Sequence, residues 1–286
     1  MNLENIITVS SKNGDFSDLG SAISSVASKA SKTNPFLVVV GPGVYSISTT
    51  VKLAPYVYVE GSGKGVTTLD GSIGSTGFSE AAAVLSMAKN SRISSLTIQN
   101  TGSTKPSSIG VYSEQLLQAE LENIQILVTN DANNSCGIYC KSASPSISNC
   151  FIYAGSQSKT VTNTYGVRLD GNAKPEINNV KINVYGGAYA HGIFYTGQYN
   201  LDITNAHIVC DIATQKNFCI FVNSGYVRVR NSELLAPNTS TAKPYAVYIN
   251  LNGKSSNFFN CVVDGDVGGP GIANFYASFD STGNPR

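Results

Sequence analysis

Two neighbouring stretches of the chain decide its fold, 163-NTYGVRLDGNAKPEINNVKIN-183 and 189-YAHGIFYTGQYNLDITNAHIV-209. Each contains a glycine followed by a β-branched residue, Gly166-Val167 and Gly192-Ile193, and each reaches an asparagine 13 residues after that glycine. Around Asn179 and Asn205 apolar and polar residues alternate, which is typical of a half-buried β-strand. The two stretches are therefore copies of one structural repeat.

The repeat extends in both directions from this pair and covers residues 109–265 at a period near 27. Further pairs of a small and a β-branched residue stand at Gly110-Val111, Gly137-Ile138, Cys219-Ile220 and Ala246-Val247. The asparagine column continues at Asn123, Asn149, Asn231 and Asn260.

A repeat of this length without helical periodicity favours a solenoid made of short strands. In a parallel β-helix each coil stacks ~4.8 Å above the last, so aligned residues touch their equivalents. We therefore predict an all-β fold, a right-handed parallel β-helix, with the asparagines stacked as a buried amide ladder at a turn. Two interior files are expected, Val111, Ile138, Val167, Ile193, Ile220 and Val247, and Ile126, Ile152, Ile182, Ile208, Leu234 and Val263.

The ends of a solenoid need covers because their strand edges are unpaired. We expect one domain over 1–286, with an N-terminal strand and cap helix in 1–35, coils in 36–265 and an irregular tail in 266–286. The helix is predicted over 17–31 with Ser17 as its N-cap.

Composition limits the function. The 19 basic and 18 acidic residues nearly cancel, which argues against a nucleic-acid partner. The sequence has no apolar run long enough for a transmembrane helix, so no membrane partner is expected. Its six cysteines have no zinc-site spacing and are expected as buried thiols. No metal and no cofactor are predicted. No signal peptide is visible, yet the fold leads us to expect a secreted or cell-surface protein.

The first seventy residues resemble the opening of pectin methylesterases and related right-handed β-helix proteins of the pectate lyase-like superfamily. The likeness rests on Gly14-Asp15-Phe16, on 36-FLVVVGPGVY-45 and on 59-VEGSG-63. It implies the fold for nearly the whole chain, but one fold hosts many activities.

The catalytic motifs that the resemblance would imply do not carry over. Pectin methylesterases use a Gln-Asp pair and an Arg before Pro-Trp, whereas this chain has no Gln-Asp pair and no Trp. The Gly-His-Gly of polygalacturonases is matched only by His191-Gly192, preceded by Ala190, with Asp170 one coil earlier. The Arg-x-Pro-x-x-Arg motif of pectate lyases is missing too.

One outward file of the predicted coils is aromatic. Because it alternates with the interior valines and isoleucines, it should face solvent beside a floor of glycines. Sugars stack on aromatic faces, so an extended glycan could follow such a strip. A protein partner or self-association would use it equally well, or loops at 129–135, 155–164 and 185–190 would cover it. The file comprises Tyr112, Tyr139, Arg168, Phe194, Phe221 and Tyr248.

Two further outward files, on either side of the asparagine column, are polar. Glu176 and Asp202 should lie one coil apart with Arg228 next, and Lys181, His207 and Glu233 should form a parallel file. Paired carboxyls, or a base near a cation, could serve glycoside hydrolysis or elimination. A solvated series of ion pairs is the alternative reading of both files.

Three classes of function follow. The first is a β-helix that binds polysaccharide without the family's mechanism. The second is a lyase or glycoside hydrolase that uses Glu176, Lys181, Asp202, His207, Arg228 and Glu233. The third is a structural or adhesin-like solenoid that binds another protein.

Overall fold

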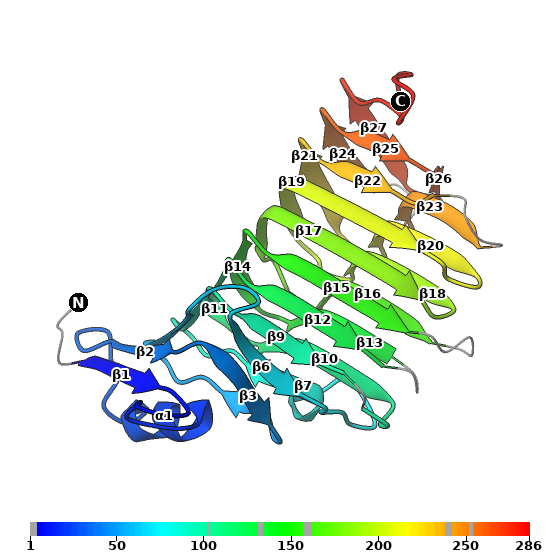
Figure 1. Ribbon diagram of the computed structural model, residues 1–286. Helices are drawn as coiled ribbons and strands as arrows, with labels where there is room; N and C mark the ends of the chain where they lie inside the picture. The colour runs from blue at the N-terminus through cyan, green and yellow to red at the C-terminus, as the bar shows by residue number, and fades with distance from the viewer. Residues whose placement is uncertain (1–4, 102, 131–133, 157–161, 238–241, 252–253) are drawn as a thin grey trace.

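The computed structural model describes residues 5–101, 103–130, 134–156, 162–237, 242–251 and 254–286. The chain is an all-β, right-handed parallel β-helix of about nine turns, as predicted (Figure 1). Each coil contributes a strand to three faces of the solenoid. Faces 1 and 2 belong to one 18-stranded sheet, and face 3 is a separate nine-stranded sheet.

Face 1 holds the strands that precede the asparagine column, and face 2 holds those that follow it. Face 1 comprises β1 (Ile6–Val9), β2 (Phe36–Val40), β5 (Val57–Gly61), β8 (Arg92–Ser94), β11 (Leu117–Glu122), β14 (Ser144–Ser148), β21 (Tyr226–Arg230), β24 (Ser255–Phe259) and β27 (Ile272–Tyr276). Face 2 comprises β3 (Gly43–Ile47), β6 (Thr67–Gly71), β9 (Thr97–Asn100), β12 (Gln125–Thr129), β15 (Phe151–Ser156), β22 (Glu233–Leu235) and β25 (Val262–Asp264). Two long strands turn the corner and serve both faces, β17 (Glu176–Gly186) and β19 (Asn200–Asp211).

Face 3 closes each coil. It comprises β4 (Val51–Lys52), β7 (Ala83–Ser86), β10 (Ser107–Glu114), β13 (Asn134–Lys141), β16 (Asn163–Asp170), β18 (Tyr189–Tyr195), β20 (Lys216–Val222), β23 (Lys243–Ile249) and β26 (Asp266–Gly268). A 3₁₀ turn, η2 (Glu80–Ala82), precedes β7.

The two predicted interior files form the core of the solenoid. Val111 pairs with Ile138 and Ile138 with Val167, and Ile126 pairs with Ile152 and so on along the solenoid. Every member of both files is fully buried. All six cysteines are buried free thiols and act as small core residues, as expected.

The asparagine column forms the corner between faces 1 and 2, but it is not buried. Asn149, Asn179, Asn205, Asn231 and Asn260 are exposed, which corrects the predicted buried amide ladder. All of them have φ near +50°, the left-handed region that asparagine tolerates better than most residues. Amide bonds are intermittent: Asn179 Nδ2 donates to Asn149 Oδ1 at 2.7 Å, whereas Asn205 donates to Asn178. The backbone turn, more than the amide stack, selects asparagine here.

Asn179→Ala is therefore expected to lower the free energy of unfolding by about 1 kcal/mol, the cost of a left-handed alanine. Asn179→Gly keeps the turn and loses the amide, so it should leave the midpoint of urea unfolding almost unchanged. An equal loss in both variants would show that the amide bond to Asn149 supplies the stability instead.

Both ends differ in detail from the prediction. The helix is α1 (Leu19–Val26), and its N-cap is Asp18, which accepts a hydrogen bond from the Ser21 amide, not Ser17. It covers the N-terminal end beside β1 and β2 (Figure 1). The C-terminal segment is not an irregular tail, because β26 pairs with β23 and β27 pairs with β24, which adds a further partial coil.

Candidate functional site

The strand register brings the predicted aromatic file together on face 3. Tyr112, Tyr139, Arg168, Phe194, Phe221 and Tyr248 are direct partners in successive strands from β10 to β23. The file divides into two parts. Tyr112 and Tyr139 are buried, and the Phe78 ring packs edge-on against Tyr139. Phe194, Phe221 and Tyr248 remain partly exposed. Among the described residues, this second half is the part of the file that offers a surface to a ligand.

A second aromatic file runs beside the first and was not predicted. It comprises Tyr165, His191, Phe218 and Tyr245. Strict alternation from Arg168 would point Tyr165 inward and Gly166 outward. Instead Gly166 and Val167 both face the core, since a Cβ on Gly166 would lie 2.3 Å from Ile182 Cγ2. The glycines are therefore interior residues and do not form the outer floor that we expected.

The two files pack as tilted stacks. Phe194 and Phe221 lie nearly parallel with ring centroids 5.2 Å apart, and Phe221 and Tyr248 are 5.3 Å apart. Rings of the neighbouring file meet them edge to face, as Phe218 meets Phe221 at 77°. Such spacings are those of offset stacking, in which each ring leaves an edge and part of one face uncovered. The result is a rigid, ridged apolar floor.

This floor lies in a shallow groove of about 410 Å³. Polar side chains stand along its borders, with Lys216 at one edge and Asn250 at the other. Asn250 Nδ2 donates to Asn223 Oδ1 at 2.8 Å, so the second border is an amide pair. The groove thus combines an aromatic floor with hydrogen-bonding rims. Its lining is completed by Asn163, Tyr165, Tyr189, His191, Phe194, Phe218, Phe221 and Tyr248.

His191 is the buried polar member of the floor. Its ring is sandwiched between Tyr165 and Phe218, with both centroid distances 5.0 Å. Only 5% of the residue is exposed, and its Nδ1 atom has no hydrogen-bond partner within the described ranges. Burial, with a smaller contribution from the charge of Arg168, lowers the pKa of His191 to about 3. The imidazole is therefore neutral at physiological pH.

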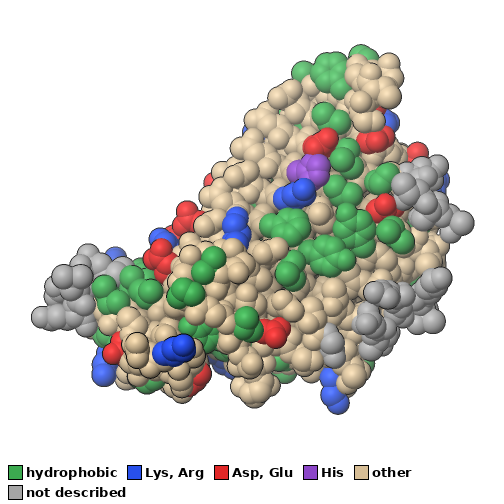
Figure 2. All heavy atoms as spheres, in the orientation of Figure 1, with side chains coloured by type: hydrophobic (Ala, Val, Ile, Leu, Met, Phe, Trp, Pro, Cys, Tyr) green, Lys and Arg blue, Asp and Glu red, His purple; other side chains and the backbone are tan. Residues whose placement is uncertain are grey.

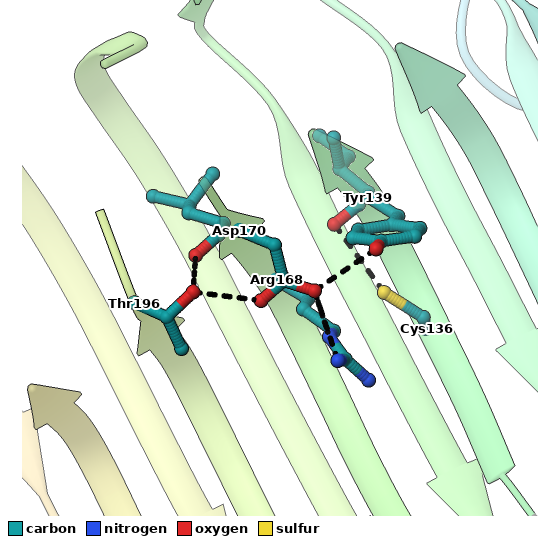
Figure 3. Close-up of polar contacts among 7 residues, drawn as sticks. Cys136, Tyr139, Arg168, Asp170 and Thr196 are labelled. Atoms are coloured by element: carbon teal, nitrogen blue, oxygen red, sulfur yellow. Dashed lines mark hydrogen bonds and ion pairs between the residues drawn. The ribbon is translucent and has the colours of Figure 1, made fainter. Parts of the chain in front are cut away.

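Arg168 is aligned with Phe194 in the first aromatic file and belongs to a cluster of polar contacts (Figure 3). Its Nε and Nη2 atoms both lie 2.9 Å from Asp170 Oδ2. Tyr139 donates to the same oxygen at 2.9 Å, and Thr196 donates to Oδ1 at 3.0 Å. The guanidinium lies among four aromatic rings, 4.9 Å from the centroid of Phe78. The cluster joins β13 and β16 to the residue that follows β18.

Asp170→Ala should lower the free energy of unfolding by about 2–3 kcal/mol, because it leaves a three-quarters buried guanidinium without its counter-charge. Adding Arg168→Met should restore part of that loss, which urea unfolding of both variants would measure. If the double variant is no more stable than Asp170→Ala alone, the loss of stability comes from the hydrogen bonds that Tyr139 and Thr196 donate to Asp170, not from the unpaired guanidinium.

The first polar file lies on face 1, where Glu176, Asp202 and Arg228 align as predicted. Arg228 Nε is 2.5 Å from Asp202 Oδ1, and Arg230 approaches the same oxygen at 3.5 Å. The ion pair raises the pKa of the Arg228 guanidinium. An open groove of about 600 Å³ contains these residues together with Lys174. Asp202 is thus a carboxylate bound by two arginines.

The second polar file lies on face 2, beyond the asparagine corner. Lys181, His207 and Glu233 align there as predicted, and His207 Nδ1 is 2.5 Å from Glu233 Oε2. His207 and Glu233 line another open groove, of about 560 Å³. The six candidate catalytic residues therefore fall on two faces, and four of them form two close contacts, Arg228 with Asp202 on face 1 and His207 with Glu233 on face 2. Across the described ranges, no three His, Cys, Asp or Glu side chains gather as they would around a metal ion. No described helix is long and apolar enough to span a membrane.

Comparison with known proteins supports the fold. A pectin methylesterase solved in complex with a hexasaccharide is 14% identical, with 96% of this chain and 89% of that one covered at a TM-score of 0.53. The Aspergillus niger pectin methylesterase is 17% identical, with coverage of 96% and 87% and a TM-score of 0.56. ORF18 of Geobacillus virus E2 is 12% identical, with coverage of 97% and 60% and a TM-score of 0.58. No protein-family model and no curated protein matches the chain.

The chain therefore has the pectin methylesterase-like β-helix fold. Identities this low establish the architecture and leave the activity to the chemistry of the site.

Proposed function

We propose that this protein binds an extended polysaccharide in the face 3 groove and does not act by the pectin methylesterase mechanism. The observation that carries the proposal is the double aromatic floor with Lys216 and Asn250 at its borders. Sugar rings have apolar C–H faces and a rim of hydroxyls, and this groove offers partners for both. Such a ligand agrees with a secreted or cell-surface location, where polysaccharides are abundant.

The spacing of the coils supports a chain-like ligand. Phe194, Phe221 and Tyr248 recur once per coil, with centroids 5.2 and 5.3 Å apart, close to the length that one sugar adds to an extended glycan. Successive sugars could therefore meet equivalent rings. The hexasaccharide in the similar pectin methylesterase structure is consistent with this class of ligand.

Replacing Phe194 and Phe221 together by Ala should weaken polysaccharide binding tenfold to a hundredfold, because each ring contact contributes ~0.5–1.5 kcal/mol. Affinity electrophoresis in gels containing neutral or acidic polysaccharides would measure it. Tyr199→Ala removes an exposed ring outside the groove and is the matched control. Retention that survives the double change with an unchanged far-ultraviolet circular dichroism spectrum would refute the site.

A second candidate function is catalysis on a polysaccharide, favoured by the short contact between His207 and Glu233. A carboxylate bonded to Nδ1 would fix the tautomer of His207 and leave Nε2 to act as a general base, with Lys181 one coil away. On this reading His207→Ala abolishes bond cleavage and leaves retention intact. Products measured by reducing-end and unsaturated-sugar assays would decide between the candidates.

A further inference from the structure

Face 2 carries a second aromatic surface, on the side of the solenoid seen in Figure 2. Phe151, Tyr153 and Tyr185 point outward from β15 and β17, because they alternate with the buried residues of those strands. Figure 2 shows hydrophobic side chains gathered there beside a histidine and charged groups. We call these three residues the face 2 platform. No sequence motif singled it out, since its aromatic residues do not recur from coil to coil.

Tyr153 lies down on the sheet in this platform. A Cβ built on Gly155 would meet the Tyr153 Cε1 and hydroxyl at 3.1 Å, so the ring covers the space that a side chain would occupy. Tyr185 lies beside it with ring centroids 5.7 Å apart at 31°. A ring that lies along a sheet turns one face to solvent, which is the geometry that stacking against the C–H face of a sugar requires.

Hydrogen-bonding groups border the platform. Lys181 is aligned with Phe151, and the His207–Glu233 pair follows in the same file. Asn183 is aligned with Tyr153, but its Oδ1 atom is buried, so the accessible polar groups here are Lys181, His207 and Glu233. Face 2 therefore repeats, with different residues, the combination of aromatic floor and polar rim found in the face 3 groove.

The two surfaces point away from each other. The inner sides of faces 2 and 3 pack together, since Gly166 faces Ile182 and Gly192 faces Ile208 across the core. The outer surfaces of faces 2 and 3 therefore point in opposite directions. One glycan strand cannot lie on both aromatic surfaces at once.

We propose that the face 2 platform is a second polysaccharide site and that the protein cross-links two glycan chains. This inference rests on the proposed function of the face 3 groove. A solenoid with two opposed sites joins strands in the way that a bivalent lectin does, so its overall avidity for a polymer exceeds its affinity for a short oligosaccharide.

The experiment compares oligosaccharide binding with polymer cross-linking. A β-glucan, a galactomannan and polygalacturonate are screened first, and the polymer that the parent protein retains is used throughout. Isothermal titration with its hexasaccharide should give two equivalents per chain for the parent protein. Mixing with the polymer should give turbidity that passes through a maximum as protein is added.

Tyr153→Ala with Tyr185→Ala should leave one equivalent, weaken the lost site tenfold to a hundredfold and abolish turbidity, while the face 3 site keeps its affinity. Phe194→Ala with Phe221→Ala should give the reciprocal result. Gly155→Ala keeps both tyrosines and lifts the Tyr153 ring, so it should weaken only the face 2 site. Tyr199→Ala should match the parent, and circular dichroism checks the fold of each variant.

One equivalent of hexasaccharide on the parent, or turbidity that persists in the Tyr153/Tyr185 variant, would overturn the second site. Loss of all hexasaccharide binding in the Tyr153/Tyr185 variant would overturn it as well, since a single site would then account for all the binding of the parent. Failure of the proposed function looks different, because the parent would then retain no polymer, or the Phe194/Phe221 variant would bind two equivalents.

Discussion

Gly192→Val is expected to be the most destabilising single substitution considered for this protein, lowering the free energy of unfolding by about 3 kcal/mol or more. A Cβ at Gly192 would lie 2.3 Å from Ile208 Cγ2 and 2.5 Å from the carbonyl oxygen of Cys219. The first group is packed in the core and the second is backbone of the next coil, so neither can move without shifting a strand. The midpoint of urea unfolding, followed by circular dichroism, measures the loss.

Gly77→Val is the control for this result, because no atom of the described part of the chain lies within 4 Å of the position that its Cβ would take. It should change stability by less than about 0.5 kcal/mol. A Gly192→Val protein as stable as the control would mean that faces 2 and 3 can separate locally, and that the inward direction of Gly192 is wrong.

His191→Phe is expected to protect the protein against acid. The native pKa of His191 is about 3, below its ordinary value of 6.5, so the unfolded chain binds the proton more tightly. Stability from this residue is fully present above pH 6.5 and is lost progressively as the pH falls toward 3. Between pH 7 and pH 4 the parent should lose about 3 kcal/mol that the variant keeps, at 1.36 kcal/mol for each pKa unit.

Phenylalanine suits the position because its neighbours in the file are Tyr165 and Phe218, whose rings stack on His191. Urea unfolding of both proteins at pH 7 and pH 4 gives the comparison, because all other residues are the same in the two proteins. Equal acid losses in the two proteins would contradict a buried neutral imidazole.

The periodicity of the sequence was enough to predict the β-helix and its register. Columns spaced by 26 to 30 residues align Val111 with Ile138 and Glu176 with Asp202, as the strands do. Periodicity could not predict that the asparagine column is exposed. A left-handed turn and a buried amide ladder both select asparagine, and only the backbone angles distinguish them.

Of the two aromatic files that form the candidate site, the sequence predicted one. Alternation placed Phe194 and Phe221 correctly on the outside. Gly166 and Val167 are consecutive and both point inward, so the alternation is interrupted there. For this reason alternation assigns Tyr165 to the interior and misses the second aromatic file. The burial of Tyr139 under Phe78 could not be predicted either, because Phe78 belongs to a segment outside the repeat. The face 2 platform depends on a ring that leans over Gly155, which no residue pattern records.

Regular coils also bear on how fast this chain can fold. Strands of neighbouring coils pair residues about 27 apart, as Val111 pairs with Ile138, however long the solenoid becomes. In a chain of 286 residues that separation corresponds to a relative contact order of about 0.1, a value characteristic of helical bundles and well below that of β-sandwiches. A first pair of coils needs to close only one such loop, and each later coil adds to an existing edge at a similar entropic cost. An all-β protein built in this way can form by nucleation and propagation, with no search for distant strand partners.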